Sequence, residues 1–139
     1  MLKDIKKLFR IASVSGIIRR KVTVVHLENI KNMYKSSNVL DIGSGIKNWS
    51  FLFPDTSKYH TLDLKDDVNA TFVGDLFTLD FKDSYNLIIA TELIEHLNSS
   101  KDFFEKASDL LDDKGILLIS FPFFFKIHGD PYDYYRFTL

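Results

Sequence analysis

Residues 39–45 read VLDIGSG, and this short stretch decides the fold. Its first four residues are apolar except for Asp41, and Gly43 ends the run. A run that does not alternate polar and apolar side chains is typical of a strand covered on both faces, as in parallel sheets. The glycines that follow allow a tight turn and a close approach to a ligand. We therefore predict a buried strand that ends at a ligand site, with a purely structural turn as the alternative.

Further apolar runs predict four more strands, separated by helical patterns. An amphipathic pattern predicts a helix over residues 102–111, followed by a turn at 112–115, and a helix is expected around 49–53. Strands that alternate with helices imply right-handed crossovers and an α/β, doubly wound, mostly parallel sheet. The four further strands are expected at residues 59–64, 70–73, 85–90 and 116–121.

The first 35 residues differ from the rest in charge. They hold nine Lys/Arg and two acidic residues, whereas residues 36–139 hold nine basic and 17 acidic residues. We predict a basic helical arm over residues 1–35 and one domain over residues 36–139. The arm caps the sheet, lies on an anionic membrane surface, or touches nucleic acid, in decreasing order of preference.

Two helices are expected within this arm. The first carries apolar side chains at helical spacing from Leu2 to Ala12. The second runs over residues 17–34, and we expect Ile18, Val22 and Val25 on one face. Its β-branched residues are unfavourable for a helix.

The composition excludes several classes of protein. The chain has no cysteine, which excludes disulfide frameworks, Cys-based metal sites and Cys nucleophiles and fits a reducing compartment. It has no apolar run of the roughly 18 residues that span a bilayer, and no signal-peptide pattern. We therefore predict a cytoplasmic protein, with contact at the inner face of the membrane through the basic arm as an addition.

Carboxylates follow the predicted strands and narrow the choice of ligand. Asp63 lies about twenty residues after the glycines, a spacing at which a carboxylate accepts both hydroxyls of a ribose, although a solvated Asp is the alternative. A dinucleotide motif G-x-G-x-x-G would need glycine where Asn48 stands. Acidic residues also repel a diphosphate but favour a cationic ligand. The pattern therefore favours a cationic, ribose-containing ligand over NAD.

Together these stretches resemble class I S-adenosylmethionine-dependent methyltransferases. The resemblance rests on residues 39–45, on Asp63, on Gly74-Asp75-Leu76 and on residues 90–97, ATELIEHL. Residues 128–138, HGDPYDYYRFT, further resemble a methyltransferase type 11-like bacterial subgroup associated with cell-surface glycans. The resemblance covers about residues 36–138 and implies a Rossmann-like sheet of about five strands in the order 3-2-1-4-5.

The resemblance also implies a site for the methionine part and the ribose of S-adenosylmethionine. Asp41 helps to hold the ammonium group, directly or through water. Gly43 and Gly45 leave room for the methionine portion, and Asp63 binds the ribose hydroxyls.

Residues after the third and fourth strands complete the implied cofactor site. Asp75 and the backbone N–H of Leu76 contact the adenine edge. Thr91 and Glu92 border the methionine end.

The chain departs from the family pattern in two places. Lys47 stands where the family often has a third glycine, so this part of the loop is expected to differ. Family members continue with a helix and an antiparallel hairpin, whereas this sequence stops at Leu139. The fifth strand is therefore expected to form an apolar edge. We expect a fragment, a decayed gene product, or a protein that associates with itself through that edge.

Two histidines are candidates for acid–base chemistry. His96 is interpreted as a group at the mouth of the site. Glu92 and His96 stand at i and i+4, but two ligands without a third predict no metal site. His128, with Asp130 and Asp133 nearby in sequence, is a candidate base for a substrate hydroxyl, and a loop histidine bonded to backbone is the alternative.

An aromatic segment follows the fifth strand. We expect Tyr132 and Tyr135 to line the substrate pocket and Arg136 to bind a carboxylate or phosphate of the substrate. The alternative is an aromatic lid packed on itself, with Arg136 as a structural residue.

The sequence therefore predicts an S-adenosylmethionine-dependent methyltransferase that acts on a small-molecule or glycan-type acceptor, at a hydroxyl or similar nucleophile. Nucleic acid is disfavoured as the acceptor, because enzymes that methylate base amino groups usually carry an Asn/Asp-Pro-Pro-aromatic motif after strand four. Two alternatives stay open: a non-catalytic remnant that keeps part of the cofactor fold, and an NAD-dependent oxidoreductase.

Overall fold

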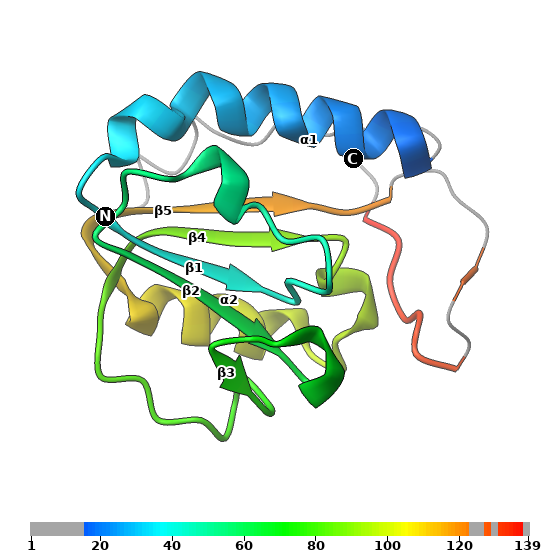
Figure 1. Cartoon of the computed structure of the whole chain (residues 1–139). Coiled ribbons are helices and arrows are strands. Elements are labelled where there is room, and N and C mark those ends of the chain that lie inside the picture. Colours follow the sequence, from blue (N-terminus) through cyan, green and yellow to red (C-terminus); the bar gives the residue numbers. More distant parts are fainter. Residues whose placement is uncertain (1–15, 123–126, 129–130, 138–139) are drawn as a thin grey trace.

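The computed structural model describes residues 16–122, 127–128 and 131–137. In this part of the chain, five strands form one sheet in the order β3-β2-β1-β4-β5, and every neighbouring pair is parallel (Figure 1). This confirms the predicted fold class and strand order. The strands are β1 Asn38–Ile42, β2 Lys58–Asp63, β3 Phe72–Val73, β4 Tyr85–Thr91 and β5 Leu111–Ser120.

Helices cover both faces of the sheet. Helix α1, Gly16–Ile30, lies on one face and α2, Ser100–Leu110, lies on the other (Figure 1). Neighbouring residues of β1 pack in two hydrophobic cores on opposite faces of the sheet. Val39 packs in the core that contains Leu27 of α1, and Leu40 packs in the core that contains the buried side chains of α2. Both faces of the central strands are therefore buried, which explains why their sequences do not alternate.

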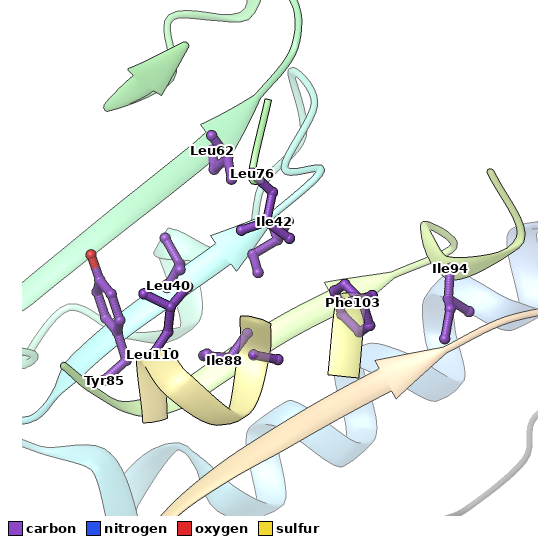
Figure 2. Packing of buried hydrophobic residues seen from close by; sticks show 11 residues of the cluster. Leu40, Ile42, Leu62, Leu76, Tyr85, Ile88, Ile94, Phe103 and Leu110 are labelled. Atoms are coloured by element: carbon purple, nitrogen blue, oxygen red, sulfur yellow. The ribbon is translucent and has the colours of Figure 1, made fainter. Parts of the chain in front are cut away.

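Helix α2 shows how local sequence and packing agree. The Ser99 side chain accepts a hydrogen bond from the Asp102 N–H and caps the first turn. Phe103, Ala107 and Leu110 recur at helical spacing and are buried. Figure 2 shows Phe103 and Leu110 packed against the sheet. The predicted helix over residues 102–111 is therefore confirmed, with an earlier start.

Helix α1 presents a different face from the predicted one. Thr23 and Leu27 are buried, whereas Val25 is 54% exposed. The helix ends at Ile30 and a 3₁₀ turn, Lys31–Tyr34, continues it and buries Tyr34. Of the residues expected on one face, Val22 is half-buried and Val25 is exposed, so the side of α1 that packs on the sheet is marked by Thr23 and Leu27 instead. The side chain of Ile18 and the helix expected between Leu2 and Ala12 lie outside the part described.

Two short segments also differ from expectation. The expected helix at 49–53 is a single 3₁₀ turn, Ser50–Leu52. The expected turn at 112–115 falls within β5, where pairing passes from Leu111 opposite Tyr85 to Ile116 opposite Leu87. The extra residues bulge from the ladder between these two pairs.

The two ends of the sheet order are β3 and β5. Strand β5 therefore has a neighbour on one side only among the described residues, as expected for an edge. In the same part of the chain, no helix combines the length and the apolar character needed to cross a bilayer.

Candidate functional site

A cavity of about 600 Å³ opens where β1, β2 and β4 end. In the strand order, β1 lies between β2 and β4, so connections leave it in opposite directions. Ligands of open parallel sheets bind at such a switch point. Five of the eight residues expected to bind the cofactor line this cavity: Gly43, Gly45, Asp63, Thr91 and Glu92.

The glycine turn has the conformation that its sequence requires. Gly43 and Gly45 have φ values of +68° and +56°, a region in which most other residues are strained. A Cβ atom on Gly43 would lie 2.9 Å from Leu93 Cδ1, whereas one on Gly45 would meet no atom within 4 Å. A side chain at Gly43 would therefore displace the end of the Leu93 side chain, whereas Gly45 faces open space.

Asp63 clamps this turn from the end of β2. Its Oδ2 atom accepts a hydrogen bond of 2.9 Å from the Gly45 N–H, and its Oδ1 atom accepts one of 3.1 Å from the Lys65 N–H. The two motifs that stand about twenty residues apart in sequence therefore meet at one edge of the sheet.

Glu92 occupies a strained position at the end of β4. Its φ is +53°, which is uncommon for a residue other than glycine. Its N–H donates to the Ser120 carbonyl at 2.8 Å, and its Oε1 accepts from the Ser120 hydroxyl at 2.9 Å. These two bonds to β5 hold the strained backbone while Glu92 lines the cavity.

The two candidate histidines lie together. The rings of His96 and His128 pack edge to face, with centroids 5.0 Å apart. His96 Nδ1 donates to the Tyr132 carbonyl, and His128 Nδ1 lies 3.2 Å from Asp133 Oδ2. The expected carboxylate neighbour of His128 is therefore Asp133; Asp130 lies outside the described residues.

The residues expected to bind substrate do not line the cavity. Arg136 binds the Asp133 carboxylate with both terminal nitrogens, at 2.6 Å for Nη2 to Oδ2, and this pairing holds the pKa of Asp133 well below its usual range. The Tyr135 hydroxyl donates to the Asn98 carbonyl at 2.7 Å, and Tyr132 is 63% exposed. This geometry matches the structural alternative for Arg136.

The three remaining cofactor candidates also lie off the cavity lining. Asp41 is buried, and its Oδ2 accepts from the Trp49 N–H at 3.1 Å and from the Tyr59 hydroxyl at 2.7 Å. Asp75 is exposed and accepts from the Phe77 N–H at 2.9 Å, and the Leu76 side chain packs in the core.

Comparison with known proteins gives the family. A family profile described as a methyltransferase domain matches residues 16–128 of the chain. The chain belongs to this methyltransferase domain family. The expectation of an S-adenosylmethionine-dependent methyltransferase domain is thereby confirmed, and it displaces the oxidoreductase alternative. No curated protein matches the chain significantly.

Solved structures share the fold of this methyltransferase domain at low sequence identity. The N-methyltransferase NodS from Bradyrhizobium japonicum WM9 has a TM-score of 0.59 and 13% identity, and the match covers 76% of this chain and 70% of NodS. Coclaurine N-methyltransferase has a TM-score of 0.59 and 16% identity, with 80% of this chain and 38% of that chain covered. DesVI from Streptomyces venezuelae has a TM-score of 0.56 and 12% identity, with 78% and 58% covered. The chain thus spans between 38% and 70% of these proteins.

Several residues that line the cavity were not among the expected cofactor ligands, and two of them contact each other. Arg20 and Trp49 both line it, and the Arg20 guanidinium lies 4.2 Å from the centre of the Trp49 ring. Arg20 also donates to the Lys47 carbonyl at 3.1 Å, and the Trp49 indole N–H donates to Thr91 Oγ1 at 3.2 Å. Helix α1 and β4 therefore both contact the segment that directly follows the glycine turn. Of these two residues, only Trp49 could have been singled out from the sequence, because it is the one tryptophan of the chain and follows the glycine turn by four residues.

Two buried acids in the methyltransferase domain have raised pKa values. Burial raises the pKa of Asp41 to about 6, against the opposing effect of its hydrogen bonds from Tyr59 and Trp49. Burial also raises the pKa of Glu95 to about 7, and the nearby charge of Glu92 adds to the increase. Glu95 lies in the 3₁₀ turn Ile94–His96 directly after β4.

Proposed function

We propose that this methyltransferase domain transfers a methyl group from S-adenosylmethionine to a hydroxyl or similar nucleophile of a small-molecule or glycan-type acceptor. The observation that carries the proposal is the cavity at the switch point of the sheet, where Gly45, Asp63 and Glu92 meet. The paired histidines follow the ends of β4 and β5, the two strands that Glu92 and Ser120 join.

Asp63 and the glycine turn hold the cofactor in this proposal. The Asp63 carboxylate binds the two ribose hydroxyls while it keeps the turn in place through Gly45. Acidic Glu92 favours the positive charge of the sulfonium and ammonium groups. Asp41 is buried and accepts a hydrogen bond from the Trp49 N–H, so it positions the segment after the glycine turn. Its effect on the ammonium group is therefore indirect.

Asp75 and the Leu76 N–H are proposed to contact the adenine edge. Both follow β3, which lies next to β2 and so beside Asp63. Thr91 borders the methionine end together with Glu92, and its hydroxyl accepts from Trp49 on the wall of the cavity.

The reaction needs alignment and removal of a proton. When bound, S-adenosylmethionine supplies a methyl group already activated by the sulfonium. The cavity aligns the acceptor oxygen with the methyl carbon and excludes water. The simplest use of the histidine pair is that His128, next to Asp133, takes the hydroxyl proton, with His96 packed against it. Tyr132 and Tyr135 lie in the same segment and are proposed to contact parts of the acceptor outside the cavity, and Arg136 acts by fixing Asp133.

The subgroup and the partners belong to the same proposal. We assign the chain to the bacterial subgroup with the DYYRFT segment at residues 133–138 because its Asp and Arg form the ion pair beside His128. Helix α1 of the basic arm covers one face of the sheet, and we propose peripheral contact of the arm with an anionic membrane surface as an addition to this role. The β5 edge supports self-association. Vesicle sedimentation and sedimentation velocity test these two contacts.

Isothermal titration with S-adenosylhomocysteine and with NAD tests the cofactor. We expect saturable binding of S-adenosylhomocysteine alone, and preferential binding of NAD would overturn the proposal. Release of S-adenosylhomocysteine from S-adenosylmethionine is then measured with a panel of hydroxyl-bearing sugars and matched amino sugars. Turnover with amino sugars only would refute the hydroxyl acceptor. Binding without turnover on any acceptor would favour the non-catalytic remnant.

A further inference from the structure

Three potential metal ligands converge after β4 and β5. Glu95, His96 and His128 each offer one ligand atom, and these atoms all lie within 4.8 Å of one another. The two segments are more than thirty residues apart in sequence, so the fold creates this group.

Glu95 has no partner that accounts for its burial. Its side chain is fully buried, and neither carboxylate oxygen accepts a hydrogen bond from the described residues. A buried carboxylate without hydrogen bonds is unfavourable, and nearby Glu92 adds a like charge. His96 Nε2 lies 3.9 Å from Glu95 Oε1, and the positive charge of Arg136 also acts on Glu95. The carboxylate therefore points at a position where a cation would be stabilised.

The surroundings of both histidines match those of metal ligands. Metal-bound imidazoles usually place their other ring nitrogen against a carbonyl or carboxylate, which fixes the ring. His96 Nδ1 donates to the Tyr132 carbonyl, so its Nε2 is directed toward Glu95. His128 Nδ1 lies 3.2 Å from Asp133 Oδ2, and Arg136 holds that carboxylate in turn.

We infer that Glu95, His96 and His128 bind a divalent transition-metal ion. Two imidazole nitrogens and one carboxylate oxygen suit Zn²⁺, Co²⁺ or Mn²⁺, whereas Mg²⁺ and Ca²⁺ prefer oxygen ligands. Ligand bonds of about 2.0–2.2 Å require these three groups to move closer by roughly 1 Å on binding. Three protein ligands leave a coordination position open.

The inference changes the role of the histidine pair and rests on the proposed function only for the use of the ion. A histidine nitrogen that ligates a metal takes no proton, so metal binding replaces general-base catalysis by His128. An acceptor hydroxyl at the open position would instead lose its proton to water, because a metal ion lowers the pKa of a bound oxygen. Acceptors that carry oxygen ligands are then the preferred class.

Metal titration of the tag-free 139-residue chain, stripped with a chelator, tests the site directly. We expect one equivalent of Zn²⁺ by calorimetry and at least hundredfold weaker binding of Mg²⁺. Co²⁺ added alone should give the visible absorption of a low-coordinate nitrogen and oxygen site. His96→Ala and His128→Ala should each weaken Zn²⁺ binding at least tenfold, whereas His26→Ala, on α1, should leave it unchanged.

Failure of saturable Zn²⁺ binding in the wild-type chain would overturn the inference, as would equal affinities of His96→Ala and His26→Ala. Glu95→Gln preserves the size of the buried side chain, so it is the variant to use if a histidine variant does not fold. The Glu95→Gln protein should lose the visible absorption of bound Co²⁺. S-adenosylhomocysteine binding is measured in chelator and should be the same for wild type and variants. Loss of that binding in the wild type would count against the proposed function and not against the metal site.

Discussion

Replacing Asp63 with alanine separates its two predicted roles. In the structure, its carboxylate accepts hydrogen bonds from Gly45 and Lys65 at 2.9 and 3.1 Å. Both bonds are in partly exposed loops, so we expect their loss to lower the free energy of unfolding by about 1–2 kcal/mol. The ribose hydroxyls would lose a charged acceptor at the same time, which costs roughly 2–3 kcal/mol of binding free energy. This corresponds to a dissociation constant for S-adenosylhomocysteine about 30- to 150-fold higher.

Asp67→Ala is the matched control for this change. Asp67 lines the same cavity and carries the same charge, so its removal reports general electrostatic attraction without the clamp on the glycine turn. Calorimetric titration of both variants, with urea unfolding in parallel, gives the two free energies separately. An Asp63→Ala protein that folds and binds S-adenosylhomocysteine with the affinity of the Asp67→Ala protein would refute the ribose role.

Three further changes test the surroundings of the cavity. Because the folded pKa of Asp41, about 6, is above its unfolded value, Asp41 favours folding most at low pH and loses that contribution as pH rises through 6. Asp41→Asn should therefore gain about 1–2 kcal/mol over wild type between pH 5 and pH 7.5 in urea unfolding, and a difference that is constant with pH would contradict the burial argument. Arg20→Ala removes the contact with the Trp49 ring and the bond to Lys47, so S-adenosylhomocysteine affinity should fall roughly 3- to 10-fold, and unchanged affinity would show that α1 does not support the turn. Ser36→Gly relieves a φ of +57° at an exposed position and should raise thermal stability by up to about 1 kcal/mol; a lower melting temperature would count against strain there.

The sheet could be predicted from sequence because each of its central strands carries its own signal. Residues 39–42 and 85–90 are apolar runs that end at glycine or at a polar group, and both are buried on two faces in the structure. The turn at Gly43 and Gly45 was also predictable, since positive φ values restrict the residue type. Structural features that depend on one short segment could therefore be predicted from the sequence alone.

Contacts between distant elements were not predictable in this way. Helix α1 has apolar residues on several sides, so sequence gave no reason to prefer Leu27 over Val25 as the buried residue. In the sequence, Arg20 is one of several basic residues in the same segment, and only the fold places its guanidinium over the Trp49 ring. Partners of this kind are set by the position of the sheet, which no local pattern encodes.

The residues of the proposed metal site show why spacing along the sequence does not reveal which side chains are neighbours. The i, i+4 relation of Glu92 and His96 implies neighbouring side chains only on a helix. Here β4 runs to Thr91, Glu92 has a positive φ, and the following 3₁₀ turn begins only at Ile94, so the two side chains share no helical face. The strained turn instead buries Glu95 beside His96, and His128 approaches from beyond β5. His128 is more than thirty residues from His96 in sequence, so only the folded chain brings the two rings together.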